Sequence, residues 1–299
     1  MPAVSVVVAT YRRDSKLRCA LESLLIQTYK DFEVIVVDDN DFLEWNNKVS
    51  EIIDNFKSSN PDIKIKYFQN HPSLGSALAR NKGIDVSSGE FICFLDDDDI
   101  FLPKRIENQI ISMIEADADY SVTDLALYNE SGKLVEIRNR KYIIDTSKEQ
   151  LQKYHLLYNI TGTDSMMFRR SYLHMIGSFS PIDIGDEYYL MQKAIENNGK
   201  FLYVPVCDIK AYVHNDHGGL SSSDEKIDGE NELYTFKKKY FDYLDFKGRQ
   251  YVKMRHHAVL AYAYIRNRRY LLFIKESILS FFSSPVFCFK LFFDRFNSK

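Results

Sequence analysis

Cysteine pairs, a glycine-rich first turn and a long uncharged run are all missing from this sequence of 299 residues. The four cysteines are widely spaced and form no C-x-x-C pair, which argues against a zinc module or a disulfide framework. They are Cys19, Cys93, Cys207 and Cys288. No charged-then-apolar signal segment accompanies the short apolar run Val4–Ala9. We therefore expect a cytoplasmic protein.

The longest uncharged run near the C-terminus, Ser277–Phe289, has 13 residues and contains Pro285. It falls well short of the roughly 20 residues that span a bilayer. Residues 233–299 carry 14 Lys/Arg and 4 Asp/Glu, whereas residues 1–232 carry 25 and 38. This basic tail is rich in Phe, Tyr and Leu, which favours anionic lipid over nucleic acid. We expect peripheral contact with the inner face of the plasma membrane; a helical cap packed on the rest of the chain is the alternative.

The first hundred residues alternate between β-rich and helix-periodic segments, a pattern typical of a mainly parallel α/β sheet flanked by helices. The expected strands are Val4–Thr10, Phe32–Asp39, Ile63–Gln69 and Glu90–Leu95. The expected helices are Leu17–Leu25, Leu74–Gly83, one after Pro103, and one from Gly185 to Asn197. The stretch Tyr120–Tyr154 predicts a hairpin or meander around Asn129–Gly132, and the pattern beyond Asp224 is wholly helical.

Four consecutive acids, Asp96–Asp99, directly follow the apolar run Phe91–Leu95. Adjacent carboxylates repel one another unless a cation neutralises them, and oxygen ligands suit Mg²⁺ or Mn²⁺. Such ions take their remaining ligands from water and substrate phosphates, so the run indicates a diphosphate-bearing substrate. A solvent-exposed acidic turn is the alternative.

A second group of acids, the pair Asp38 and Asp39, lies at the end of the second expected strand. Acids at this place in an α/β sheet commonly hydrogen-bond a ribose or a base. The turn Ala9–Asp14 contains no glycine that would let the backbone approach a pyrophosphate, so an NAD-type dinucleotide is excluded. The sequence instead predicts a nucleotide held by side chains and metal, although an Asx turn explains Asp38 alone equally well.

Four segments, in order along the chain, carry a family resemblance. They are Val4–Tyr11, Gln27–Asp39, Ala79–Gly83 and Leu95–Pro103. Together they resemble glycosyltransferase family 2, and the similarity extends over residues 1–220. The resemblance implies the GT-A fold, a Rossmann-like domain with a mainly parallel central sheet, to which this chain adds a C-terminal helical extension.

The resemblance also implies an activity and a division of the chain. The activity is inverting transfer of a sugar from a nucleotide-sugar, such as a UDP-sugar, with Mn²⁺ or Mg²⁺ bridging the diphosphate. The acceptor is expected to be a glycan or a lipid-linked glycan in cell-envelope or capsular polysaccharide synthesis. Residues 1–102 would form the nucleotide-sugar-binding half and 103–223 the acceptor-binding half, followed by a basic, aromatic-rich helical extension at 224–299.

By position, the resemblance assigns donor contacts to several residues. Asp39 is expected to read the nucleobase, and Thr10 and Tyr11 to line the same pocket. Arg80 is expected to approach the donor, with a surface charge on a helix as the alternative. Thr161–Ser165, just before an expected strand, resembles the family's acceptor-side segment.

The same comparison assigns the metal ligands. Asp96 and Asp98 match the two acids of the family's D-x-D element, and Asp98 is the expected metal ligand. Asp97 departs from the pattern by placing an acid at the variable middle position, so the division of labour among the four acids stays open. His214 is the better candidate of two loop histidines to complete the site, and His217 is the other; a plain surface role is the alternative.

Catalysis needs a base that takes the proton of the acceptor hydroxyl. The family places Glu-Asp, an aromatic residue and Leu at the start of a helix, whereas this chain has the inverted pair Asp186-Glu187. Glu187 holds the base position when counted back from Leu190, and we prefer it narrowly over Asp186. A helix N-terminus is expected to keep the carboxylate ionised. Simple helix capping is the alternative for Asp186.

Two other functions compete with this interpretation. An apolar strand followed by Asp-x-Asp also opens the haloacid-dehalogenase-like phosphatases, but Ile100 stands where they usually have Thr or Val, and β/α units precede the motif here. The inverted acidic pair also allows a catalytically inactive sugar-nucleotide binder, or a scaffold that docks on a membrane complex through its tail.

Overall fold

The computed structural model describes residues 2–182, 184–213 and 224–290. The chain divides into two compact units. The first comprises Met1–Thr146, Ile160–Ile182 and Asp186–Val213. The second comprises Ser147–Asn159, Asp183–Gly185 and His214–Lys299.

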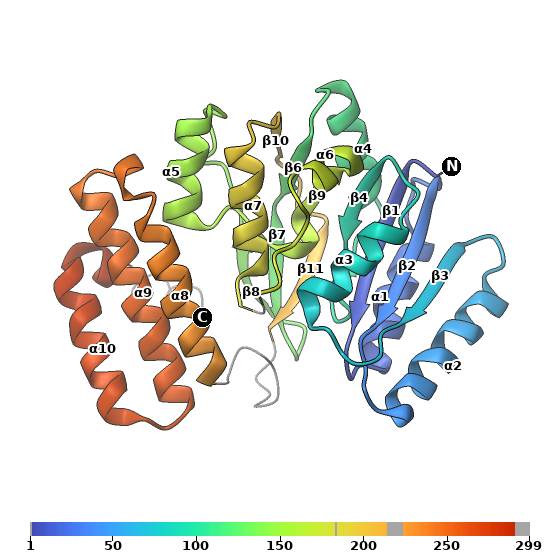
Figure 1. Cartoon of the computed structure of the whole chain (residues 1–299), viewed down its shortest axis with the longest axis horizontal. Coiled ribbons are helices and arrows are strands. Elements are labelled where there is room, and N and C mark those ends of the chain that lie inside the picture. The colour runs from blue at the N-terminus through green and yellow to red at the C-terminus, as the bar shows by residue number, and fades with distance from the viewer. Residues whose placement is uncertain (1, 183, 214–223, 291–299) are drawn as a thin grey trace. The chain divides into compact units, whose positions relative to one another are not determined.

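Within the described residues of the first unit, seven strands form one sheet in the order β10-β6-β9-β4-β1-β2-β3 (Figure 1). They are β1 (Val4–Thr10), β2 (Phe32–Asp38), β3 (Lys64–Gln69), β4 (Phe91–Phe94), β6 (Tyr120–Thr123), β9 (Met166–Arg169) and β10 (Phe201–Val204). β1 pairs in parallel with both β2 and β4, and only β9 runs antiparallel to its neighbours in this described sheet. The predicted, mainly parallel α/β sheet is confirmed.

Helices cover both faces of this sheet. They are α1 (Ser15–Leu25), α2 (Leu43–Ser59), α3 (Ser76–Val86), α4 (Arg105–Glu115), α6 (Arg170–Met175) and α7 (Asp186–Glu196). The alternating residues of a strand face opposite sides of a sheet. One side of β2, represented by Val34, therefore shares a core with α1 and α2, while Ile35 on the other side packs against Ala79 of α3. Because the helices cover both faces, the loops at the strand ends are left to form a site.

Four further strands, β5 (Ile100–Phe101), β7 (Leu125–Asn129), β8 (Leu134–Arg138) and β11 (Ile209–Val213), form a second sheet in the order β5-β11-β7-β8. β7 and β8 are antiparallel, and their turn closes where the Asn129 N–H donates to the carbonyl of Lys133. The predicted hairpin around Asn129–Gly132 is thus confirmed, although Tyr120 at its expected start belongs to β6 of the larger sheet.

Two helices differ from the sequence-based expectations. The expectations contain no helix at α2, which buries Val49, Ile52, Ile53 and Phe56 at helical spacing. The expected meander also ran to Tyr154, but helix α5 (Lys148–Tyr158) begins inside it. That part of the prediction was wrong because α5 buries only a short stripe, including Leu151 and His155, among mostly polar residues.

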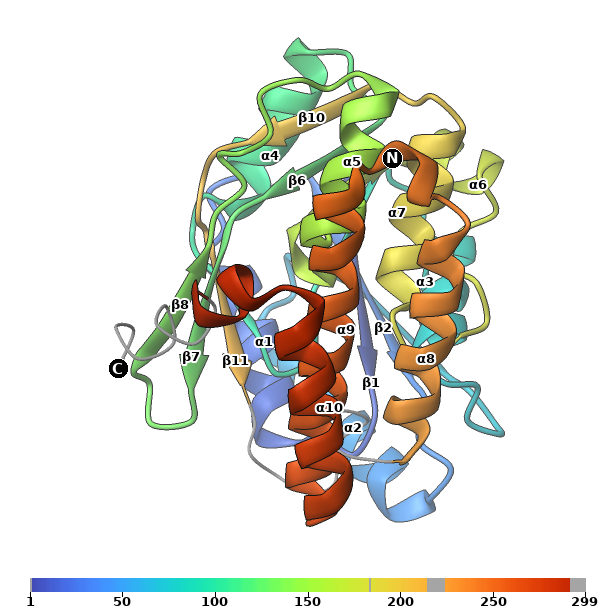
Figure 2. The same ribbon diagram turned by 90° about the vertical axis from the view of Figure 1, so that its left-hand side faces the viewer.

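The described part of the second unit is mainly helical, which confirms the helical pattern predicted beyond Asp224. With α5 it contains α8 (Asp224–Lys238), α9 (Phe246–Arg266) and α10 (Tyr270–Ser283). Figure 2 shows α9 and α10 side by side, and the His257 ring nitrogen Nδ1 lies 2.7 Å from a carboxylate oxygen of Glu276 between them. Among the described helices, none combines the length and the apolar character needed to cross a membrane.

Candidate active site

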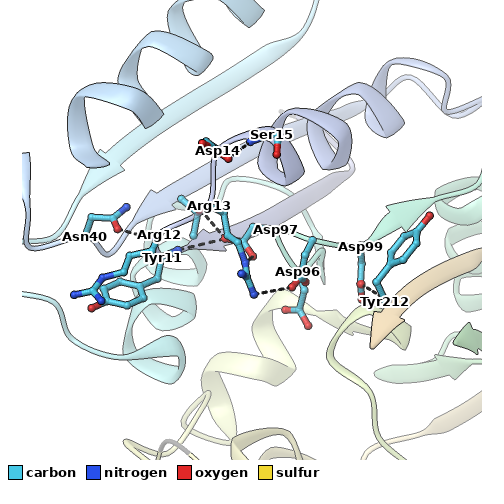
Figure 3. A network of polar contacts seen from close by, with 12 residues as sticks. Tyr11, Arg12, Arg13, Asp14, Ser15, Asn40, Asp96, Asp97, Asp99 and Tyr212 are labelled. Atoms are coloured by element: carbon cyan, nitrogen blue, oxygen red, sulfur yellow. Dashed lines mark hydrogen bonds and ion pairs between the residues drawn. The ribbon is translucent and has the colours of Figure 1, made fainter. Parts of the chain in front are cut away.

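The ends of β1, β2 and β4 bring three loops to one edge of the larger sheet. Thr10 at the end of β1 is in register with Asp38 at the end of β2, and Leu95 just after β4 donates its N–H to the carbonyl of Val7. Ligands of open α/β sheets bind beyond such carboxyl ends. Figure 3 shows polar side chains from these loops converging there.

The four acids Asp96–Asp99, named the quartet here, each have a different partner. Asp96 lies 2.8 Å from a guanidinium nitrogen of Arg80, and Asp98 lies 3.0 Å from one of Arg13. Asp97 accepts a hydrogen bond from the hydroxyl of Thr10 at 2.6 Å. Asp99 accepts the backbone N–H of Tyr212 at 2.8 Å. Each side chain of the quartet is therefore held by a contact with a different part of the chain. An exposed acidic turn, the alternative explanation of the run, does not have this geometry.

A fifth acid, Asp164, joins the quartet from a distant part of the sequence. Its carboxylate accepts the backbone N–H of Asp96 at 2.7 Å, and it is almost fully buried. Carboxylate oxygens of Asp96, Asp99 and Asp164 all lie within 4.8 Å of one another. The family resemblance places the segment that contains Asp164 on the acceptor side, so the contact of this side chain with the quartet is a finding of the structure.

Burial, and after it the crowding of the carboxylates, raises the pKa values of Asp96, Asp97, Asp99 and Asp164. Burial, followed by the charge of Asp164, raises the pKa of Asp96 to about 7. Burial, followed by the charge of Asp98, raises the pKa of Asp97 to about 7. Burial and the neighbouring carboxylates also raise the pKa of Asp99 well above its usual range. A dense group of oxygen ligands whose charges oppose one another fits a hard divalent cation such as Mg²⁺ or Mn²⁺.

The two acids at the end of β2, Asp38 and Asp39, accept hydrogen bonds from groups close to them in the fold. Asp38 is fully buried and accepts hydrogen bonds from the side chains of Asn40, Asn46 and Tyr67. These contacts give Asp38 a structural role, which agrees with the alternative explanation of this residue as part of an Asx turn.

Asp39 fixes the segment that follows β3. Its carboxylate accepts the side chains of Asn70 and Ser73 and the backbone N–H groups of Leu74 and Gly75. The nucleobase contact inferred for Asp39 stays a prediction.

The loop after β1 exposes Tyr11 beside the quartet. The Arg12 guanidinium lies 4.9 Å from the ring centroids of both Tyr11 and Phe42, so the three side chains stack at the surface. The Tyr11 N–H points at Asp97 from 3.3 Å. Thr10 and Tyr11 thus lie against the quartet, and a nucleotide-lining role for them stays a prediction.

Arg80 joins the quartet to helix α7. One guanidinium nitrogen lies 2.8 Å from Asp96 and another 2.8 Å from Asp186, the first residue of α7. The side chain of Arg80 is only 12% exposed, which rules out the alternative of a surface charge. The two nearby carboxylates raise the pKa of Arg80 although burial opposes this, so the guanidinium stays charged.

The two members of the acidic pair differ in their environment. Asp186 is buried, pairs with Arg80 and accepts the N–H of Glu187 at 2.9 Å. Glu187 is partly exposed, and burial together with the charge of Asp186 raises its pKa to about 8. The expectation that the helix N-terminus keeps Glu187 ionised is therefore wrong, because burial and the neighbouring acid outweigh the helix dipole.

The two candidate histidines, His214 and His217, lie outside the described residues. A metal-ligating role for His214 stays a prediction.

Neutralising one acid of the quartet should stabilise the fold when divalent cations are removed. The folded-state pKa of Asp97, about 7, exceeds the ordinary aspartate value of 3.8, so stability is lost as the pH rises from about 4 to about 7. In EDTA at pH 8, we expect Asp97→Asn to raise the free energy of unfolding by about 1–3 kcal/mol, with the gain shrinking toward pH 4.

Thermal and urea unfolding at several pH values measure this effect. Asp85→Asn, which neutralises an exposed acid on α3, is the matched control and should change little. A variant at Asp97 that is no more stable than the wild type at pH 8 would contradict the charge crowding described here.

Comparison with known proteins gives relatives over much of the first unit. The family model described as glycosyl transferase family 2 matches residues 5–175. An uncharacterised glycosyltransferase of Methanocaldococcus jannaschii is 33% identical over 203 residues, which cover 67% of this chain and 67% of the relative. The GalNAc(5)-diNAcBac-PP-undecaprenol beta-1,3-glucosyltransferase of Campylobacter jejuni is 32% identical over 175 residues, which cover 58% of this chain and 53% of the relative. The chain spans 19% to 21% of the length of three Rickettsia relatives.

Solved structures share the fold at low sequence identity. S. aureus TarS 1-349 in complex with UDP-GlcNAc has a TM-score of 0.60 and 15% identity, and the match covers 92% of this chain and 89% of TarS. GalNAc-T7 with UDP, GalNAc and Mn²⁺ has a TM-score of 0.59 and 16% identity, with coverage of 86% and 52%. The resemblance inferred from four sequence segments is confirmed by a family match over more than half of the chain, which decides against a haloacid-dehalogenase-like phosphatase. The chain belongs to glycosyl transferase family 2 and has the GT-A fold.

Proposed function

We propose that this protein transfers a sugar from a UDP-sugar to a hydroxyl group of a lipid-linked glycan, with Mn²⁺ or Mg²⁺ as cofactor and with inversion at the anomeric carbon. The observation that carries the proposal is the double ion pair of Arg80, which joins Asp96 to Asp186. It brings the acids expected at the donor diphosphate and those expected at the acceptor hydroxyl into one site.

The relatives support the choice of substrates. The name of the Campylobacter enzyme states an acceptor glycan on undecaprenol diphosphate. The TarS structure contains UDP-GlcNAc, and the GalNAc-T7 structure contains UDP and Mn²⁺. We extend a UDP-sugar donor, a divalent cation and a lipid-linked acceptor to this chain, and with them a role in cell-envelope or capsular polysaccharide synthesis.

The quartet would hold the divalent cation, with Asp98 and Asp96 as the ligands assigned by family position. Carboxylates crowded enough to raise one another's pKa values are suited to this, because a cation relieves their repulsion. When bound, the cation would stabilise the negative charge that develops on the leaving diphosphate.

Glu187 is the proposed base. The acceptor oxygen bonds to the anomeric carbon, the bond from that carbon to the diphosphate oxygen breaks, and the hydroxyl proton passes to the Glu187 carboxylate. Attack opposite the leaving diphosphate inverts the anomeric configuration. A pKa near 8 gives the ionised carboxylate a high affinity for that proton near neutral pH. Asp186, paired with Arg80, raises this pKa and orients the start of α7.

Two conservative substitutions separate the members of the acidic pair. We expect Glu187→Gln to lower kcat by about 100-fold or more, because the amide accepts no proton at this step. Because the base must be ionised, kcat/KM of the wild type should rise with pH, reach half of its maximum near pH 8 and level off above that pH. Asp186→Asn removes a charge that raises the pKa of Glu187, so it should move this rise to lower pH and leave substantial activity.

Steady-state kinetics with UDP-sugars and a lipid-linked acceptor between pH 5 and 9 measure these effects. Full activity in Glu187→Gln together with loss of activity in Asp186→Asn would contradict this assignment and make Asp186 the base. A wild type that binds UDP but turns over none of a panel of sugar donors would instead favour the inactive binder or scaffold.

The second unit supports a peripheral membrane contact. Large apolar side chains on α10 are exposed, among them Leu271 at 84% and Phe282 at 76%. Arg268, Arg269 and Lys275 lie within or next to this helix. Apolar side chains that enter a lipid interface beside basic ones that attract anionic headgroups are typical of interfacial helices. Such a contact suits an acceptor anchored in a lipid.

Vesicle co-sedimentation tests the contact. The protein should bind vesicles of anionic lipid more strongly than neutral ones, and the paired substitutions Leu271→Ser and Phe282→Ser should weaken binding by on the order of tenfold. Ile144→Ser, which removes an equally exposed apolar side chain from the first unit, is the matched control and should bind as the wild type does. Equal binding by the α10 variant and the control would exclude α10 as the membrane surface.

A further inference from the structure

Arg13 pairs with the acid that is expected to hold the metal. Its guanidinium nitrogen Nη2 lies 3.0 Å from Oδ2 of Asp98, and its Nε lies 3.8 Å from Oδ1 of Asp97. Figure 3 shows Arg13 reaching from the loop after β1 toward the acidic run. A single arginine thus supplies positive charge to two carboxylates of the quartet.

The side chains of Arg12 and Arg13 have different partners, and the backbone conformation of Arg12 lies between them. Arg12 has a left-handed backbone with φ of 52°, and its N–H donates to the side chain of Asn40 at 2.8 Å. Residues other than glycine adopt this conformation at a cost, and it is found at sites where a side chain must be aimed. The Arg12 guanidinium stacks on Tyr11 and Phe42, whereas that of Arg13 faces the quartet.

The two arginines at the quartet differ in how firmly they are held. Arg80 is 12% exposed and lies between two carboxylates that belong to different elements. Arg13 is 32% exposed, and both carboxylates that it contacts belong to the same segment of the chain. A doubly charged ion attracts a carboxylate more strongly than one guanidinium does at similar distance. Arg13 is therefore the cation that can leave Asp98, while Arg80 remains in place.

We propose that Arg13 is an exchangeable counter-ion of Asp98, which yields this carboxylate to the divalent cation and then binds the diphosphate of the nucleotide-sugar. The inference rests on the proposed function, because it takes Asp98 as a metal ligand. The planar guanidinium matches phosphate oxygens with two parallel hydrogen bonds, so the released side chain gains a partner of the same charge as the one it lost.

Opposite changes in two affinities test the proposal. In Arg13→Ala, Asp98 has lost a competing cation, so Mn²⁺ alone should bind about fivefold more tightly than to the wild type. The same variant lacks a phosphate contact, so UDP at saturating Mn²⁺ should bind on the order of tenfold more weakly. Calorimetric titrations measure both affinities, and thermal unfolding checks that each variant is folded. A salt bridge with a merely structural role would not change the two affinities in opposite directions.

Two further variants serve as controls. Arg18→Ala removes one positive charge from an exposed position on α1 and should leave both affinities unchanged. Arg13→Lys keeps the charge without the planar fork, so it should retain the Mn²⁺ affinity of the wild type and lose part of the UDP affinity.

The outcomes distinguish this inference from the function on which it rests. If Mn²⁺ binds the wild type but Arg13→Ala binds it no more tightly, or binds UDP equally well, the role of Arg13 is wrong and the metal site stands. If Mn²⁺ binds neither the wild type nor any variant, the metal site itself is wrong and the exchange falls with it.

Discussion

The repulsion among acids at the end of β4 is the constraint on which the rest of the site depends. Asp96, Asp97, Asp99 and Asp164 all have raised pKa values because partial or full burial disfavours their charged forms and neighbouring carboxylates add to the effect. Such crowding costs stability, and a protein tolerates it where the charges have partners. Arg13 and Arg80 balance part of the charge, and the proposed divalent cation would balance more. The crowding arises because four acids follow one another shortly after β4 and Asp164, just before β9, packs against them.

Arg80 extends this constraint to the acceptor side. By pairing with both Asp96 and Asp186, it links the charge of the quartet to the start of α7. Asp186 is thereby committed to an ion pair, and its charge raises the pKa of Glu187. The order Asp-Glu is inverted relative to the family pattern, and here the shorter acid is the one that pairs with the arginine. In the proposed mechanism the longer acid would then take the proton, and donor binding and base strength would be coupled through the Arg80 guanidinium.

The sequence predicted the strands of the first hundred residues closely, since β1 spans Val4–Thr10 as expected and β2 differs by one residue. Strong apolar runs and the acids that follow them are local features, and the family resemblance followed from them. The contact of Asp164 with Asp96 joins residues 68 positions apart, and nothing local indicates it. The pKa of Glu187 was misjudged for a similar reason, because burial and the neighbouring Asp186 are set by tertiary structure. Helix α2 is different, since the apolar spacing of its buried residues is a local feature from which the helix can be predicted.

The most direct test of this account is a calorimetric titration of the purified protein with UDP, carried out with and without Mn²⁺, for the wild type and for Asp98→Asn. UDP should bind the wild type tightly only when Mn²⁺ is present, and Asp98→Asn should abolish this dependence along with most of the affinity. Equal binding of UDP with and without the metal, or unchanged metal-dependent binding in Asp98→Asn, would contradict the claim that the quartet holds a cation against the donor diphosphate.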